Sequence, residues 1–181
     1  TKTIVPATVQ FVDIGGLVAG ASKGEGLGNR FLSHIREVDA IVYVLRAFED
    51  EDVPGPSDPL EHLAVVELEL TYADLESVER QIERRRKAAK GDRSLADEVA
   101  ALDQAKAVLE AGTPIYRSEL SDAARALLKP YFLLTNRPVL ALVNVSEDQL
   151  DDILAVIAPV EAKLGGKAEV IGMCVQLEAE A

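Results

Sequence analysis

Four short apolar runs divide the chain, and each has the length of a buried strand. They span Thr8–Asp13, Ala40–Phe48, Arg137–Val145 and Ala168–Val175. Near-continuous apolar runs of this kind are typical of strands buried in a parallel sheet. Between them the apolar residues recur at steps of three and four, which predicts helices. Strands that alternate with helices predict an α/β fold with a parallel sheet.

The stretch between the second and third runs has a different, charged texture. It starts after the acidic loop Glu49–Pro59, whose three prolines mark a boundary. Helical spacing then covers Leu60–Lys90 and Leu95–Leu109, joined by the short turn Lys90–Ser94. Two heptad-like helices with so short a turn predict an antiparallel coiled-coil hairpin. We therefore expect a helical insertion over residues 59–112 and an α/β portion made of residues 1–58 and 113–181.

Shorter helices are predicted around the remaining runs. Asn29–Val38 places its apolar residues on one helical face, and Ser121 can cap a helix over Asp122–Lys129. Ser146 can cap a further helix over Glu147–Leu164, which Pro159 should kink or split.

Composition narrows the class of protein. The chain has 181 residues, with 31 acidic against 19 basic residues and a formal charge of −12, which argues against a broad basic surface for DNA. The single cysteine, Cys174, excludes an internal disulfide framework and suits a reducing compartment. No apolar run approaches the roughly 18 residues of a membrane span. We expect a cytoplasmic protein without a membrane partner.

A glycine-rich segment follows the first run. Asp13-Ile-Gly-Gly16 has the form D-x-x-G, and six glycines fall within the fourteen residues Gly15–Gly28. In nucleotide-binding α/β folds the ligand lies at the carboxyl ends of strands, where Asp13 could hold magnesium through water and Gly16 could donate its N–H to a phosphate. An ordinary strand-to-loop turn explains the same residues. The G-x-G-x-G spacing of Gly24–Gly28 speaks against a Rossmann-type cofactor binder.

Two further motifs end the later runs. Asn144-Val-Ser-Glu147 follows the third run, and its amide and acid could contact the edge of a purine base. Ser146 and Glu147 equally suit a simple helix start. Met173–Leu177 closes the fourth run, where a plain strand end is the alternative. Because parallel strands end at one edge of a sheet, a single nucleotide could touch all three motifs.

In this order the motifs resemble the YchF subfamily of the Obg-like P-loop NTPases. The residues that carry the match are Phe11–Asn29, Ile35–Ile41, Asp58–Leu60, Glu67–Glu79 and Asn144–Glu147. The resemblance covers almost the whole chain, including the helical hairpin. It implies an α/β fold that is part of a P-loop NTPase (G-domain) parallel sheet, with the antiparallel coiled-coil hairpin inserted into it.

The resemblance also implies binding and hydrolysis of ATP, and less well of GTP, with magnesium, and association with the ribosome or ribosomal proteins. Asp13, through water, would hold the metal, and Asp13 with Gly16 would sense the γ-phosphate. Leu17 stands in the switch region where many GTPases have a water-orienting Gln, so no catalytic residue is assigned. Glu147 replaces the Asp of N-K-x-D, which disfavours guanine. Nucleotide binding is implied for Asn144, Val145, Glu147, Cys174, Val175 and Gln176.

Two departures limit the resemblance. The sequence contains no G-x-x-x-x-G-K-[ST], so it resembles an internal fragment that lacks the P-loop and the C-terminal TGS domain. We expect such a fragment to be inactive alone. The loop Glu49–Pro59 also lacks the His that family members often carry. His34 and His62 are expected at surface or packing positions and receive no catalytic role.

A second class of function stays open. The hairpin could be the working part of a non-enzymatic interaction module, which docks a protein or ribosomal surface through its charged faces. Most charged helix faces are merely solvated, so the sequence alone does not decide between the two classes.

Overall fold

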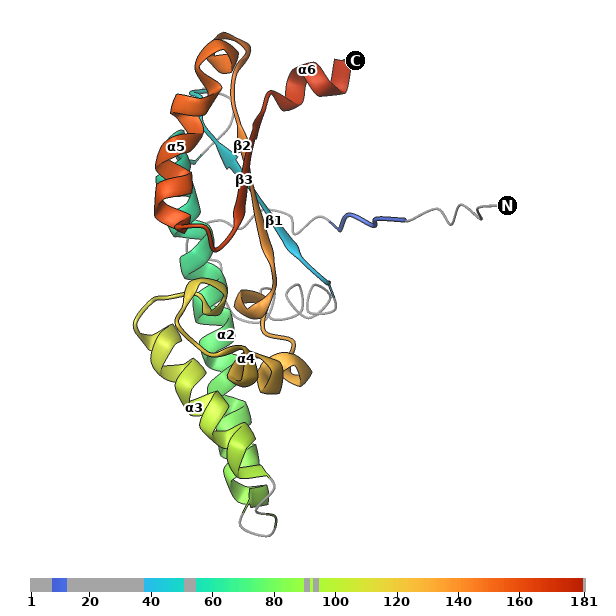
Figure 1. Ribbon diagram of the computed structural model, residues 1–181, viewed down its shortest axis with the longest axis vertical. Helices are drawn as coiled ribbons and strands as arrows, with labels where there is room; N and C mark the ends of the chain where they lie inside the picture. Colours follow the sequence, from blue (N-terminus) through green and yellow to red (C-terminus); the bar gives the residue numbers. More distant parts are fainter. Residues whose placement is uncertain (1–7, 13–37, 51–54, 90–91, 93–94, 181) are drawn as a thin grey trace, which may run out of the picture.

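The computed structural model describes residues 8–12, 38–50, 55–89, 92 and 95–180. Its sheet has three strands, β1 (Ile41–Arg46), β2 (Val139–Asn144) and β3 (Glu169–Met173), in the order β1-β2-β3 (Figure 1). Both strand pairs are parallel. The predicted α/β class with a parallel sheet is therefore confirmed, and the three strands fall within the last three of the predicted runs.

Helices account for most of the rest of the described chain. The two long ones are α2 (Pro59–Ala89) and α3 (Ala96–Glu110). Three shorter α-helices are α4 (Asp122–Leu128), α5 (Ile153–Leu164) and α6 (Val175–Glu180). Short 3₁₀ helices are η3 (Ile115–Arg117), η4 (Lys129–Tyr131), η5 (Leu134–Asn136) and η6 (Glu147–Asp152). Within the described residues, no helix is both long enough and apolar enough to cross a bilayer.

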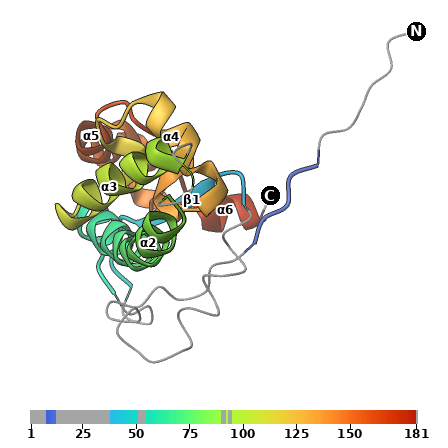
Figure 2. The ribbon, with the colours of Figure 1, turned by 90° about the horizontal axis from the view of Figure 1, so that it is seen from below.

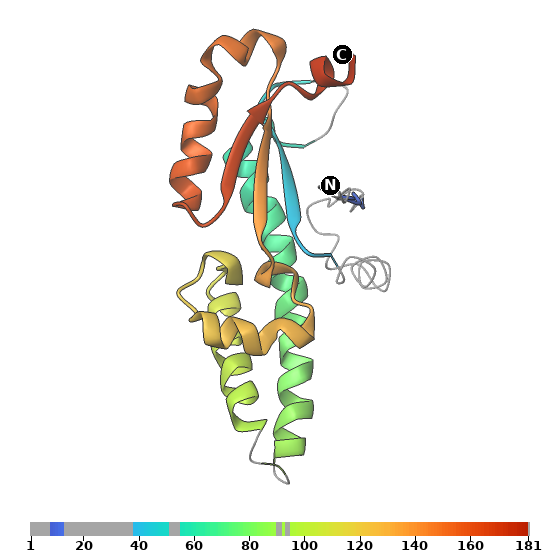
Figure 3. The ribbon, with the colours of Figure 1, turned by 45° about the vertical axis from the view of Figure 1, so that its right-hand side comes forward.

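One face of the sheet is covered by α2 and α5. Figure 3 shows both helices on the same side of the three strands. Leu45 of β1 and Val143 of β2 are fully buried on this face, where they pack with α5 residues such as Val160. At Gly172 a Cβ atom would lie 2.7 Å from Ile153 Cγ1, so glycine lets α5 approach β3 closely. Among the described residues, the hydrophobic core of the sheet lies on this side.

The opposite face of the sheet is open among the described residues. Its apolar side chains alternate with those of the covered face, and Val44 is 54% exposed and Ile171 42% exposed. The face carries, in register, Val42, Leu140 and Glu169, then Val44, Leu142 and Ile171, then Arg46, Asn144 and Met173, so its middle row is wholly apolar. A sheet face this apolar is usually buried against another layer.

The helices α2 and α3 form an antiparallel pair below the sheet (Figure 1). They pack through a second hydrophobic cluster, in which Val78, Leu102 and Ala105 are fully buried. The cluster also takes in residues from beyond the hairpin, among them Leu128 of α4. Seen from below in Figure 2, α4 lies against α3 on the side away from α2. The predicted antiparallel packing of the two helices is borne out.

Two buried carboxylates of α2 bond the chain segments that lie between α3 and β2. Asp74 of α2 is 0% exposed, and it accepts hydrogen bonds from the backbone N–H of Leu134 at 2.9 Å and from Thr135 through both its N–H (2.6 Å) and its hydroxyl (2.8 Å). Glu67, two turns earlier, accepts 2.7 Å bonds to both its oxygens from Arg117. Burial of these acids is tolerated because each is saturated with donors.

Two tyrosines pack at the same junction. Tyr116 donates its hydroxyl to Glu67 at 2.6 Å, and its ring meets that of Tyr43 edge to face at 6.3 Å. Burial raises the pKa of both phenols, and the nearby Glu67 carboxylate raises them further. The Tyr43 hydroxyl has no hydrogen-bond partner within the described structure. Both phenols therefore stay protonated in the folded protein up to strongly alkaline pH.

The structure departs from two predicted elements. Residues 8–12 of the predicted strand Thr8–Asp13 are not in a strand, and Phe11 is 80% exposed. An apolar pattern supplies side chains for a strand but not the neighbouring backbone, and no described strand pairs with this segment. The predicted helix Asn29–Val38 lies almost wholly outside the described residues.

The predicted helix Glu147–Leu164 is also different from expectation. It divides between Asp152 and Ile153, where η6 gives way to α5, and α5 continues through Pro159. Pro159 is exposed, so water can hydrate the Ala155 carbonyl that loses its intrahelical bond.

Candidate functional site

The carboxyl ends of the three strands are tied together at one edge of the sheet. The Ala47 N–H donates to the Asn144 carbonyl at 2.9 Å, and the Val145 N–H donates to the Met173 carbonyl at 3.0 Å. Both bonds extend the parallel ladders one residue beyond the strands. The chain leaves β1, β2 and β3 at this one edge, which in parallel α/β sheets is where ligands bind.

Asn144 connects two of the predicted motifs directly. Its side-chain Oδ1 accepts a 3.1 Å hydrogen bond from the Val175 N–H, which follows the end of β3. The amide thereby fixes the start of the Val175–Gln176 segment against the end of β2. The structure thus brings together the N-x-x-E motif and the stretch around Cys174. The two bonded residues, Asn144 and Val175, are 31 residues apart in the chain.

The remaining predicted nucleotide-binding residues surround this bond. Val145 and Cys174 are buried beneath it, whereas Glu147, Val175 and Gln176 are exposed at the edge. Glu147 is the first residue of η6, and its carboxylate faces solvent. An exposed carboxylate beside a fixed amide can accept N–H groups from a planar heterocycle.

The phosphate and metal part of the predicted site lies outside the described residues. Asp13, Gly16, Leu17 and the glycine run all fall there, as does His34. Among the residues that the structure describes, no group of three or more His, Cys, Asp or Glu side chains could hold a metal ion. The assignment of magnesium to Asp13 therefore stays a prediction.

Gln149 also lies at this edge of the sheet, and it was not among the residues predicted for the site. Its Oε1 accepts from both the N–H and the hydroxyl of Ser146 at 3.0 Å, and its Nε2 donates to the Ala47 carbonyl at 2.8 Å. The signal was present in the sequence, because Ser146 and Gln149 have the S-x-x-Q spacing of a capping box. Only the structure reveals the third bond, which crosses to the end of β1.

The end of β1 is also held from the side of α2. The Arg46 N–H donates to His62 Nδ1 at 3.2 Å, and the Arg46 guanidinium donates to the carbonyls of Gly55 at 2.6 Å and Pro56 at 3.2 Å. Partial burial lowers the pKa of His62, and the charge of Arg46 lowers it further. A neutral imidazole is the form that can accept this bond. His62 is half-buried here, and its neutral imidazole accepts a hydrogen bond from the end of β1.

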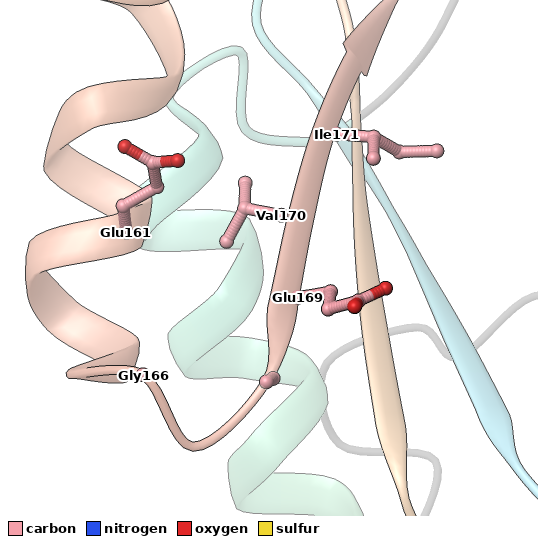
Figure 4. A pocket seen from close by; sticks show the side chains of 6 residues that line it. Glu161, Gly166, Glu169, Val170 and Ile171 are labelled. Carbon is pink, nitrogen blue, oxygen red and sulfur yellow. The ribbon is translucent and has the colours of Figure 1, made fainter.

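A shallow pocket at the other end of β3 is a weaker candidate. It is lined by Glu161, Gly166, Ala168, Glu169, Val170 and Ile171 (Figure 4). Val170 points toward α5, while Glu169 and Ile171 point to the open face of the sheet. Its two ionisable groups are both carboxylates, which would repel phosphates. The pocket does not suit a nucleotide.

The fold and its polar carboxyl edge are those of the nucleotide-binding α/β proteins. The family model described as "50S ribosome-binding GTPase" matches residues 1–72. The chain is 43% identical over 186 residues to the ribosome-binding ATPase YchF of Bacillus subtilis, covering 99% of this chain and 51% of that protein. It is 42% identical over 151 residues to Obg-like ATPase 1 of Oryza sativa subsp. indica, covering 81% of this chain and 38% of that protein.

A solved structure agrees with these sequence relatives. The Schizosaccharomyces pombe YchF GTPase has a TM-score of 0.72 to this chain at 34% identity, over 92% of this chain and 48% of that one. The chain belongs to the YchF family of Obg-like ATPases. It spans about half the length of the relatives that it matches.

Proposed function

We propose that this chain is the second half of the nucleotide-binding domain of a magnesium-dependent ATPase that also hydrolyses GTP, less well, and works on ribosomes in the cytoplasm. The observation that carries the proposal is the 3.1 Å bond from the Val175 N–H to Asn144 Oδ1. This bond joins two of the three motifs at one edge of the sheet, which supports the proposal. Relatives that are named ribosome-binding ATPases support the same function.

In this proposal Asn144, Val145 and Glu147 with Cys174, Val175 and Gln176 hold the purine base. Glu147 accepts N–H groups from the base, and its extra methylene, relative to Asp, disfavours the two-pronged contact that guanine needs. Asp13 and Gly16 take the metal and the γ-phosphate. The donor set suits Mg²⁺, which prefers carboxylate and water oxygens. Magnesium would supply charge neutralisation at the phosphates when bound.

The proposal gives the isolated chain a limited role. Without a G-x-x-x-x-G-K-[ST] segment it lacks the backbone nest and the Lys that hold phosphates in P-loop proteins. We expect the 181-residue chain to bind ATP weakly and to hydrolyse none measurably. A longer protein that also carries a P-loop would hold the activity.

Calorimetric titration of ATP and GTP into such a longer protein tests the proposal. We expect tighter binding of ATP than of GTP, and the Glu147→Asp variant should shift the ratio of the two affinities toward GTP. The matched control is Glu161→Asp on α5, which should leave the ratio unchanged. A strong guanine preference of the wild-type protein would overturn the role given to Glu147. Tight ATP binding by the 181-residue chain alone would overturn its dependence on a P-loop.

One observation favours ribosome docking through the hairpin as a second activity. The last two turns of α2 are basic in a chain of net charge −12, since Arg80–Lys87 holds five basic residues and one acid. Arg84 and Lys87 are exposed there. A basic helix end far from the sheet suits a phosphate-rich surface such as ribosomal RNA.

Co-sedimentation with ribosomes separates the two activities. The double variant Arg84→Glu/Lys87→Glu should lose about tenfold in ribosome affinity, with a weaker dependence on salt. Lys129→Glu/Lys163→Glu changes the net charge equally, at exposed positions outside the hairpin, and should lose far less. Equal losses in both variants would refute docking through the end of α2.

A further inference from the structure

The Gln149 side chain bonds the loop after β2 to the end of β1. Its amide nitrogen reaches the Ala47 carbonyl at 2.8 Å, across 102 residues of sequence. Its amide oxygen accepts from the Ser146 N–H and hydroxyl, each at 3.0 Å. One side chain therefore uses its donor and its acceptor in opposite directions.

These bonds close a ring at the carboxyl edge. Ala47 donates its own N–H to the Asn144 carbonyl at 2.9 Å, and its carbonyl is taken by Gln149. Gln149 in turn holds Ser146, two residues after Asn144. The ring thus runs from β1 to β2, along the loop, and back to β1. It fixes the direction in which residues 144–147 leave the sheet.

We propose that Gln149 is a positioning residue for base recognition: by bonding Ser146 and Ala47 together it holds Asn144 and Glu147 in the places where they contact the purine. This inference rests on the proposed function. Gln149 itself touches no ligand. Its effect is on the orientation of neighbouring groups, for which small displacements cost much binding.

The proposal differs in its consequences from a plain helix cap. A cap would stabilise η6, and its loss would lower overall stability without distinguishing one part of a ligand from another. A positioning residue affects the base-contacting edge alone. The phosphate-contacting residues proposed at Asp13 and Gly16 follow a different apolar run, Thr8–Asp13, so phosphate affinity should not depend on Gln149.

The test uses the protein that carries this sequence with its P-loop, and it compares ATP with inorganic tripolyphosphate, both with Mg²⁺. Gln149→Glu keeps the acceptor for Ser146 but turns a carboxylate toward the Ala47 carbonyl. We expect its dissociation constant for ATP to rise about tenfold, as for loss of a buried hydrogen bond. The constant for tripolyphosphate should stay within about twofold.

Two further variants complete the design. Gln149→Met keeps the length of the side chain and loses all three bonds, so it should match or exceed the ATP defect of Gln149→Glu. Gln104→Glu makes the same change at an exposed position on α3 and should change neither constant. Melting temperatures of all variants verify that each is folded.

A pH profile adds a readout that a cap would not move. A carboxyl group that faces a carbonyl oxygen has a raised pKa, and once protonated it can donate to Ala47 again. The ATP defect of Gln149→Glu, relative to wild type at the same pH, should therefore shrink between pH 7.5 and pH 5.5. The defect of Gln149→Met should not change.

Three results would overturn the inference. ATP affinities within twofold of wild type for both Gln149 variants would show that the bonds are dispensable. Equal losses of ATP and tripolyphosphate affinity with a lowered melting temperature would reduce Gln149 to a structural role. Failure of the wild-type protein to bind ATP would refute the proposed function, and this inference with it, before any variant is compared.

Discussion

The two hydrophobic clusters of this chain are completed in different ways. The cluster around Leu102 in the helical pair is enclosed by α2, α3, α4 and the turns that follow them. The cluster around Leu45 is enclosed on one side only, because the other face of the same sheet exposes Val44 and Ile171. Among the described residues, the hairpin cluster is therefore enclosed on all sides, whereas the sheet is covered by helices on one face only.

The two regions are nevertheless one packed unit along α2. That helix contributes Leu63 and Leu70 to the sheet cluster and Val78 and Ile82 to the hairpin cluster. The buried Asp74 sits between these two sets and bonds the backbone that precedes β2. The sheet cluster and the hairpin cluster can therefore unfold together, although only the hairpin cluster is enclosed on all sides. Variants in each region test this coupling.

The largest effect is expected for Asp74→Ala. It removes three hydrogen bonds and leaves two buried backbone N–H groups of Leu134 and Thr135 without partners, which should cost about 4 kcal/mol of unfolding free energy. Urea denaturation measures this loss. Asp97→Ala, at an exposed position in the first turn of α3, should cost no more than about 0.5 kcal/mol. A fall in unfolding free energy below about 1 kcal/mol for Asp74→Ala would contradict the stabilising role of the Asp74 hydrogen bonds.

Core truncations in each region should follow. Leu102→Ala and Leu45→Ala each empty a fully buried site and should cost about 3 kcal/mol. If the regions are coupled, both variants shift a single transition monitored by circular dichroism. Two separate transitions, with each variant moving only one, would break the account of α2 as a shared helix. Leu154→Ala serves as the control, because Leu154 is 76% exposed.

Alkaline pH should weaken the junction by a smaller amount. Burial raises the folded-state pKa of Tyr43 and Tyr116 above the unfolded value, so their stabilising effect is complete below pH 10 and is lost as pH rises beyond it. Between pH 9 and pH 11 the unfolding free energy should fall by about 2 kcal/mol. Tyr43→Phe should remove about half of that fall, and Tyr72→Phe, at a half-exposed position, should remove none. A flat profile in the wild type would contradict the burial of these phenols.

The smallest effects should mark the open face of the sheet. Val44→Thr should change the unfolding free energy by no more than about 0.5 kcal/mol, since its side chain is already in water. Val143→Thr places the same hydroxyl on the covered face and should cost about 2 kcal/mol. Equal costs at the two positions would mean that another layer covers the open face.

The sequence predicted the elements whose signals are local. The strand runs at Ala40–Phe48 and Arg137–Val145, the long helices and the Ser121 cap follow from spacing and side-chain type, and Ser121 Oγ does accept from the Ala124 N–H at 3.2 Å. The prediction of a strand at Thr8–Asp13 was wrong for residues 8–12, because a strand needs a neighbouring backbone to pair with, and no local pattern specifies that neighbour.

The candidate site was only partly predictable for a related reason. The N-x-x-E motif was singled out at a strand end, and the family resemblance added the Cys174–Gln176 stretch at the end of the next strand. The bonds that lock them together, from Val175 to Asn144 and from Gln149 to Ala47, join residues far apart in sequence. Such contacts depend on the register of the parallel strands, which the sequence alone did not fix.

The most direct test of the central claim is an amide chemical-shift titration of the chain with magnesium and ATP at millimolar concentration. The size of the chain, 19.5 kDa, suits the method, and weak binding is sufficient for it. We predict that the shifts concentrate at Asn144–Glu147 and Cys174–Gln176. Shifts confined to the opposite end of β3, around Glu161 and Gly166–Ile171, would contradict the account.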